Sequence, residues 1–315
     1  MSTVRVVLAT DGSIESDIGG MVLQRLPLRH DAAYWAAMVT DLHAPVLAGL
    51  GASTQSVAGR SASDNWRVEK QIARQTVERV AQRLSPAAQP VVLQGEVAEQ
   101  LLKLVKSEEA DLVVSGSGAH SRFASLFLGS VSRKLVLYSE ASVLIGRKYS
   151  KEQGQGSYCR LQAKDKLDLL VAVDGSDGSE LAIESLSKLS RPAFGRIFVL
   201  AVEPLTYAAP GLDPSLLLPS FQCDLERVYA IADAAAKRIQ RCGEHVEAIT
   251  AFGRPSTEIA TIAQKNDVDL IVMGANRHGA LERFLLGSCA SETVTGAPCS
   301  VLVLRNVLPL EDQSS

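Results

Sequence analysis

The segments ADLVVSG (residues 110–116) and VDLIVMG (residues 268–274) have nearly the same sequence and lie 158 positions apart. Three further pairs of segments keep this spacing: GEV (95–97) with GRP (253–255), LGS (128–130) with LGS (286–288), and SVL (142–144) with SVL (300–302). Nearer the N-terminus, DGS (11–13) and DGS (174–176) are 163 positions apart, so the first copy carries five extra residues. A register kept over this length indicates that the chain contains two copies of one domain.

Within each copy, short apolar runs alternate with amphipathic stretches. Residues 4–10 and 167–173 are apolar and end at an Asp-Gly-Ser turn, as buried parallel strands do. Further strands are predicted at 34–39, 90–94, 111–115, 142–147 and 197–202, and helices at 64–84 (with Asp64 as N-cap), 96–108, from Ser130, and at 221–242. This alternation predicts an α/β fold of two tandem doubly wound domains. Each is expected to hold a five-stranded, mainly parallel sheet of order 3-2-1-4-5 with helices on both faces.

The boundaries follow from composition. Domains are predicted at 1–148 and 166–306, joined by a polar, glycine-containing linker at 149–165 and followed by a tail at 307–315 that we expect to fray. Loops at about 43–63 and 203–220 have the length of lids or interaction surfaces.

Composition excludes several classes of function. A net charge of −3 gives no general attraction to nucleic acid or anionic membrane. The N-terminus does not resemble a signal peptide, and no apolar run has the length of a membrane span. The five cysteines are odd in number and lack metal-ligand spacing, which favours reduced thiols in the cytoplasm.

Two loops of each copy are expected to meet at one crevice. In a 3-2-1-4-5 sheet the strand order reverses between the first and fourth strands, and ligands bind at the carboxyl ends of the strands there. Asp11 and Asp174 follow the first strand of each copy, where each would either accept a hydrogen bond from an adenine amine or ribose hydroxyl, or initiate the turn. The Gly-Ser pairs at 129–130 and 287–288 precede a helix and would either hold a phosphate or cap that helix.

The quoted motifs resemble the universal stress protein family. The resemblance rests on VLATDGS and VAVDGSDGSELAIE near the start of each copy, and on DLIVMGANRHGALERFLLGS with SETVTGAPCSVLVLRN in the second. It covers both copies apart from the linker, the long loops and the tail. Members of this family that bind ATP carry Gly, two residues, Gly, nine residues, Gly, then Ser or Thr.

Carried onto this sequence, the family pattern falls on Gly116, Ala119, Gly129 and Ser130 in the first copy, and on Gly274, Arg277, Gly287 and Ser288 in the second. The second glycine is therefore missing from both copies. Ala119 fits if its φ is negative, whereas Arg277 crowds the phosphate, binds it through a guanidinium, or is a solvated surface arginine. The resemblance also places Asp11 or Asp174, and Val39 or Val202, beside the adenine and ribose. Thr10, Val173 and Met273, which adjoin these motifs, complete the predicted nucleotide-binding set.

The last strand of each copy would be an exposed apolar edge, which tends to pair. We expect the two to pair with each other as an internal pseudo-dimer, and the resemblance also allows a homodimer through them. His120 and His278 have no partner at motif spacing, and Trp35 and Trp66 are expected to be packing residues.

The leading hypothesis is a cytoplasmic stress-response sensor or scaffold that binds ATP or AMP, with or without Mg²⁺, in at least one domain. The alternative is a scaffold that binds no nucleotide and acts through an unidentified protein partner. An enzyme is disfavoured, beyond slow incidental ATP hydrolysis, because the sequence shows no nucleophile–base pair, no metal cluster and no Walker lysine.

Overall fold

The computed structural model describes residues 3–40, 62–118, 128–148, 161–204, 218–275 and 286–312. The first domain comprises β1 (Arg5–Ala9), α1 (Ile14–Leu23), β2 (Ala33–Thr40), α2 (Ala62–Leu84), β3 (Gln89–Gln94), α3 (Val97–Ser107), β4 (Leu112–Gly116), α4 (Ser130–Tyr138) and β5 (Ser142–Gly146). The second comprises β6 (Leu169–Val173), α6 (Asp177–Ser187), β7 (Phe194–Glu203), α7 (Leu218–Arg238), β8 (Gly243–Phe252), α8 (Pro255–Lys265), β9 (Leu270–Gly274), α9 (Ser288–Gly296) and β10 (Ser300–Leu304). The predicted elements occur in the predicted order, and the structure adds a helix after the first strand of each domain, α1 and α6, which the sequence analysis did not assign.

The bounds of α2, α3 and α7 differ from prediction, α3 by one residue at each end. Asp64 lies inside α2, which includes Ala62, so its prediction as the N-cap is wrong. Helix α7 ends at Arg238 instead of 242, because Cys242 already belongs to the turn that leads into β8. The Asp-Gly-Ser turns lead into helices that were not predicted to be capped by serine: Ser13 Oγ accepts a hydrogen bond from the Ser16 amide, and Ser176 Oγ accepts one from the Ser179 amide.

All strands join one ten-stranded sheet of order β3-β2-β1-β4-β5-β10-β9-β6-β7-β8, so each half has the predicted order 3-2-1-4-5. Pairing is parallel within each half, and β5 pairs antiparallel with β10, with Leu144 opposite Leu302. The predicted internal pseudo-dimer is therefore confirmed. A homodimer through the same strands is wrong, because β5 and β10 each have neighbours on both sides.

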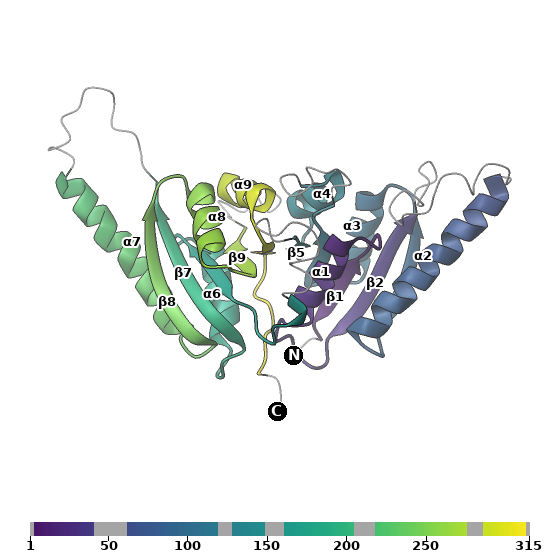
Figure 1. Ribbon diagram of the computed structural model, residues 1–315, viewed down its shortest axis with the longest axis horizontal. Coiled ribbons are helices and arrows are strands. Elements are labelled where there is room, and N and C mark those ends of the chain that lie inside the picture. Colours follow the sequence, from purple (N-terminus) through teal and green to yellow (C-terminus); the bar gives the residue numbers. More distant parts are fainter. Residues whose placement is uncertain are drawn as a thin grey trace, which may run out of the picture.

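Two apolar layers cover the two faces of the sheet, and each layer contains residues of both domains. Helices α1, α2, α6 and α7 pack on one face through side chains such as Ile18, Val77, Ile183 and Ala232 (Figure 1). Helices α3, α4, α8 and α9 cover the other face through Leu101, Leu135, Ile259 and Val294. The two domains therefore share both cores and do not pack as separate bodies.

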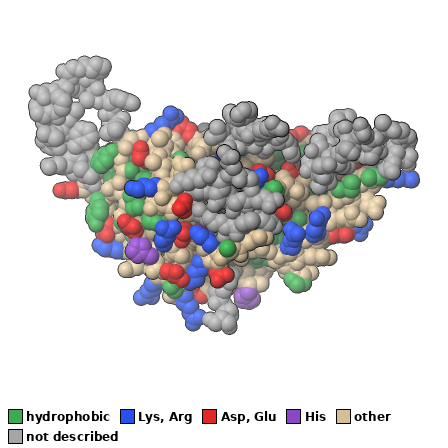
Figure 2. Space-filling model, viewed as in Figure 1, with side chains coloured by type: hydrophobic (Ala, Val, Ile, Leu, Met, Phe, Trp, Pro, Cys, Tyr) green, Lys and Arg blue, Asp and Glu red, His purple; other side chains and the backbone are tan. Residues whose placement is uncertain are grey.

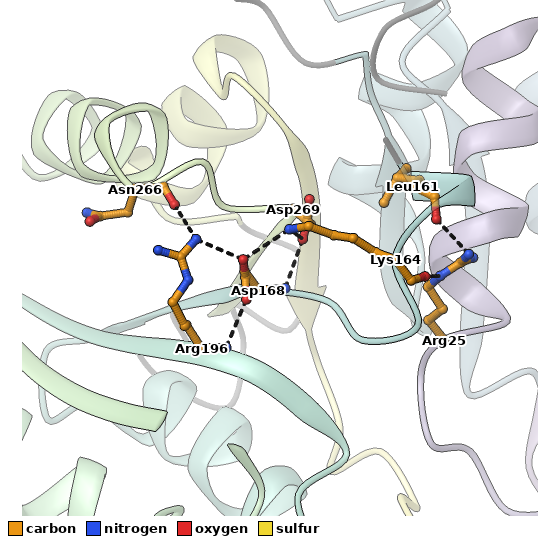
Figure 3. Close-up of polar contacts among 7 residues, drawn as sticks. All are labelled: Arg25, Leu161, Lys164, Asp168, Arg196, Asn266 and Asp269. Carbon is orange, nitrogen blue, oxygen red and sulfur yellow. Dashed lines mark hydrogen bonds and ion pairs between the residues drawn. The ribbon is translucent and has the colours of Figure 1, made fainter. Parts of the chain in front are cut away.

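The end of the linker connects the domains. Arg25, which follows the C-terminus of α1, donates to the carbonyl oxygens of Leu161 and Lys164 at 2.7 and 2.9 Å (Figure 3). The Lys164 ammonium in turn lies 3.0 Å from Asp168 and 2.7 Å from Asp269, at the amino ends of β6 and β9. Residues 161–165 are thus held between the two halves.

The tail is ordered as far as residue 312, so the expectation that it frays is wrong for residues 307–312. Leu308 and Leu310 are buried in the shared core, and Leu310 forms a bridge to Leu28 of the first domain. Asp312 accepts hydrogen bonds from Ser190 of the second domain. The tail therefore contacts both domains, and burial of its two leucines in the shared core stabilises this arrangement.

Charges of both signs are interspersed over the face seen in Figure 2, so no patch of one sign gathers there. Among the described residues, no helix combines the length and apolar composition that a bilayer crossing requires.

Candidate functional site

Each domain has a cavity at the predicted switch point. In the first domain β1 lies beside β4, and in the second β6 lies beside β9, so the loops after these strands share one crevice. Because β5 and β10 are antiparallel, the strands of the two domains run in opposite directions. The carboxyl ends of the strands, and with them the two crevices, therefore lie on opposite sides of the ten-stranded sheet along the strand direction. The cavity measures about 420 Å³ in the second domain and about 270 Å³ in the first.

The structure brings together every predicted site residue that it describes. The larger cavity is lined by Val173, Asp174, Val202, Met273, Gly274, Gly287 and Ser288. The smaller cavity is lined by Thr10, Asp11, Val39, Gly116, Gly129 and Ser130. Ala119, Arg277, His120 and His278 lie outside the described residues. The predicted geometry, in which both loops line one crevice, therefore holds in both copies.

The two aspartates initiate turns, which was one of their two predicted roles. Asp11 Oδ1 accepts a hydrogen bond from the Ser13 amide at 2.9 Å, and Asp174 Oδ1 accepts one from the Ser176 amide at the same distance. Both side chains are exposed at the rim of their cavity. The turn uses Oδ1 of each carboxylate, which leaves Oδ2 as a further acceptor.

The helices behind the Gly-Ser pairs begin without a side-chain cap. Gly129 is the N-cap of α4 and Gly287 is the N-cap of α9, and neither provides a side-chain hydrogen bond to the first turn. The first amides of a helix have no intrahelical acceptor and carry the positive end of the helix dipole. Each cavity therefore ends at a helix terminus suited to an anion.

Two motif glycines have a packing role that needs no ligand. A Cβ on Gly116 would lie 2.7 Å from the Ser16 amide nitrogen of α1. A Cβ on Gly274 would lie 1.9 Å from the Gly178 carbonyl oxygen of α6. Glycine at the end of β4 and β9 thus lets the first helix of each domain approach the sheet.

The second cavity also contains charged and thiol groups that were not predicted. Arg227 of α7 forms an ion pair with Glu203 at the end of β7, with 2.5 Å between the charged atoms. Glu203 follows the predicted Val202 and could have been included with it, whereas nothing in the sequence points to Arg227. Burial raises the pKa of the Cys289 thiol beside Ser288, so this thiol stays protonated at neutral pH.

The chemistry of the larger cavity suits a ligand with an apolar ring and an anionic end. Val173, Leu200 and Ile259 provide apolar surface, and the N-terminus of α9 provides amides. Within the described ranges, no group of three or more His, Cys, Asp or Glu side chains is arranged to hold a metal ion.

Comparison with known proteins gives one family for both halves. A model of the universal stress protein family matches residues 3–147 and 168–305. A universal stress protein of Methanocaldococcus jannaschii is 29% identical over 146 residues, which cover 44% of this chain and 81% of that protein. A universal stress protein of Thermus aquaticus is 32% identical over 141 residues, covering 44% of this chain and 97% of that protein.

Solved structures also match the whole architecture. The crystal structure of a universal stress protein from Archaeoglobus fulgidus covers 96% of both chains at 18% identity, with a TM-score of 0.55. The likeness concerns the fold.

Proposed function

Because the family model matches both halves, the chain belongs to the universal stress protein family, and we propose that it binds an adenine nucleotide, ATP or AMP, chiefly in the second domain. The observation that carries the proposal is the convergence of all seven described, predicted residues of that domain on one cavity of about 420 Å³. A cavity of this size is within the range of small-molecule sites.

Each end of the proposed ligand has a matching surface. The adenine ring would pack on the apolar wall that includes Val173 and Val202, and Asp174 would accept a hydrogen bond from the base or ribose. The phosphates would bind the first amides of α9 and the Ser288 hydroxyl. Mg²⁺ would accompany the phosphates without a dedicated protein site.

We propose that the nucleotide acts as a signal and that the protein is a stress-response sensor or scaffold without dedicated catalysis. A protonated Cys289 at the cavity suits this role better than nucleophilic chemistry does. The proposal also assigns the protein to the cytoplasm, where the free thiols of Cys242, Cys289 and Cys299 would stay reduced.

Ligand-induced stabilisation tests this function. ATP or AMP at one hundred times its dissociation constant should raise the free energy of unfolding by about 2.7 kcal/mol. Ser288→Glu should abolish this gain, because a carboxylate at the phosphate position repels the ligand. The unliganded variant should keep its stability, since a negative charge favours a helix N-terminus.

Thr261→Glu is the matched control, because it adds the same charge to an exposed position of α8 outside the cavity. It should leave the ATP-induced stabilisation intact. The proposal fails if no adenine nucleotide stabilises the wild-type protein, with or without Mg²⁺.

A scaffold that binds no nucleotide is the second candidate. It is favoured by the packing role of Gly116 and Gly274, because that role accounts for two motif glycines without any ligand. Ala119→Gly and Arg277→Gly separate the two candidates, since they restore the family pattern in each loop. If neither change alters ATP affinity, these loops do not contact phosphate.

A further inference from the structure

Two buried arginines occupy equivalent positions directly after the central strands. Arg147 follows β5 and is 3% exposed, and Arg305 follows β10 and is 2% exposed. They lie 158 residues apart, which is the spacing of the internal repeat. Burial of a guanidinium is costly, so a duplicated buried arginine calls for a specific set of contacts.

Each arginine reaches into the other domain. The Arg147 amide donates to Ser300 Oγ at 3.2 Å, and the Arg305 amide donates to Ser142 Oγ at 3.1 Å. The Arg147 guanidinium donates to the carbonyl oxygen of Val294 at 2.8 Å, in the last turn of α9. The Arg305 guanidinium donates to the Val136 carbonyl oxygen at 2.6 Å, in the last turn of α4.

These contacts suit the charge of the side chain. The last carbonyl groups of a helix have no intrahelical donor and carry the negative end of its dipole, which attracts a cation. Each guanidinium thus replaces part of its lost hydration by donating hydrogen bonds to carbonyl oxygens of the other domain's helix. Without it, those carbonyl groups would be left unsatisfied between the domains.

The other end of each helix lines a cavity. Helices α4 and α9 have nine residues each, which is about 13 Å at 1.5 Å per residue. Ser130 and Ser288, their first residues, line the first and second cavities respectively. A short helix moves as one unit, so a contact at its C-terminus sets the position of its N-terminal amides.

We propose that Arg147 and Arg305 are cross-domain positioning residues: each fixes the helix whose N-terminus forms the anion-binding end of the other domain's cavity. Each ligand site would then depend on the opposite domain through its buried arginine. The effect on ligand affinity rests on the proposed function, whereas the effect on the helices does not.

Hydrogen–deuterium exchange without ligand tests the positioning itself. Arg305→Lys keeps the charge but loses the planar guanidinium, and should raise exchange in residues 130–138 about tenfold, equivalent to about 1.4 kcal/mol. Exchange in residues 288–296 should stay unchanged, and Arg147→Lys should give the reverse pattern. Arg133→Met, at an exposed position of α4 itself, is the control and should change neither helix.

Titration calorimetry with ATP tests the consequence for binding. Arg147→Lys should weaken ATP binding to the second domain about tenfold, while Arg305→Lys should leave that affinity within about twofold. If the two variants bind ATP in the second domain with equal affinity, Arg147 does not influence ligand binding across the domains.

The two measurements separate two kinds of failure. If the wild type binds no ATP, the proposed function fails, and the exchange pattern alone decides the positioning role. If either lysine variant raises exchange equally in α4 and α9, or only in the helix of its own domain, the positioning role is overturned. Arg305→Met and Arg147→Met, which also remove the charge, should give the larger effect in the same helices.

Discussion

Where the first domain carries Thr10 and Ser132 along its cavity, the second domain carries Val173 and Ala290 at the equivalent positions. In the first domain these hydroxyl groups bind the protein itself. Thr10 Oγ1 lies 3.1 Å from Ser16 Oγ, and Ser132 Oγ donates to the Gly116 carbonyl oxygen at 2.6 Å. The wall of the first cavity is therefore polar at these two positions, and both hydroxyl groups are already hydrogen-bonded.

The second domain has apolar groups at the same places and the larger cavity. The common fold fixes where a cavity forms, because both halves have the same strand order. The side chains around it then decide what fits, because a buried aromatic base gains most from an apolar wall. Duplication thus preserved the place of the site and allowed its chemistry to diverge.

The largest expected effect concerns the glycines at the ends of β4 and β9, which let the first helix of each domain lie close to the sheet. Gly274→Ala should lower the free energy of unfolding by about 3 kcal/mol, because its Cβ would overlap backbone atoms of Gly178. Gly116→Ala should cost about 1–2 kcal/mol, since its nearest contact is longer. Urea unfolding measures both changes.

Gly296→Ala is the control for this pair, because a Cβ there meets nothing within 4 Å. It should be neutral or slightly stabilising, as alanine has the higher helix propensity. Equal costs for Gly116→Ala and Gly274→Ala would show that the two domains do not differ in how closely helix and sheet approach.

The fold and the meeting of the site loops could be predicted because they follow from periodic patterns. The internal repeat fixes equivalent strands, and a doubly wound sheet necessarily brings the loop of Asp174 beside that of Ser288. The Asp-Gly-Ser and Gly-Ser motifs are short sequence patterns that specify a turn and a helix start. Their positions at the ends of strands can therefore be predicted without knowing how side chains pack in the folded protein.

Features that depend on tertiary packing could not be predicted. The position of Arg227 over the cavity depends on how α7 is rotated, and periodicity does not specify which exposed residue faces a rim. The burial of Arg305 depends on the antiparallel pairing of the two copies, which places it beside α4. The order of the tail follows from the burial of Leu308 and Leu310, and the sequence of the short apolar run VLPL (307–310) does not reveal which surface it covers.

An intermediate effect is expected at the amino ends of β1 and β6, where the first domain has Arg5 and the second has Asp168 at the equivalent position. Burial alone would raise the pKa of Asp168, but hydrogen bonds from Arg196 and Lys164 outweigh it and lower that pKa below its ordinary value. Asp168→Asn should therefore cost about 2 kcal/mol at pH 7, since it leaves these donors with a weaker acceptor. Arg5→Met should cost less, because the Arg5 side chain is 41% exposed.

Acidification checks the origin of this difference. A lowered folded-state pKa means that Asp168 contributes fully above its unfolded-state pKa of about 4 and loses this contribution as the pH falls through the folded-state value. The stability gap between the wild type and Asp168→Asn should thus narrow from pH 7 to pH 3 in urea unfolding. A gap that stays constant would assign the cost of the substitution to packing instead of charge.

The smallest effect tests the cavity walls themselves. Val173→Thr combined with Ala290→Ser gives the second cavity the two hydroxyl groups of the first, and should weaken ATP binding about tenfold, or about 1.4 kcal/mol. The reverse pair, Thr10→Val with Ser132→Ala, should strengthen binding to the first domain and move the calorimetric stoichiometry from one toward two. Both pairs change few atoms and keep the helix N-termini, so a change in affinity reports on the cavity wall.

If Val173→Thr with Ala290→Ser leaves the ATP affinity unaltered, the base does not contact this wall. The difference between the two cavities would then lie at their rims, where the second domain has the ion pair of Glu203 and Arg227.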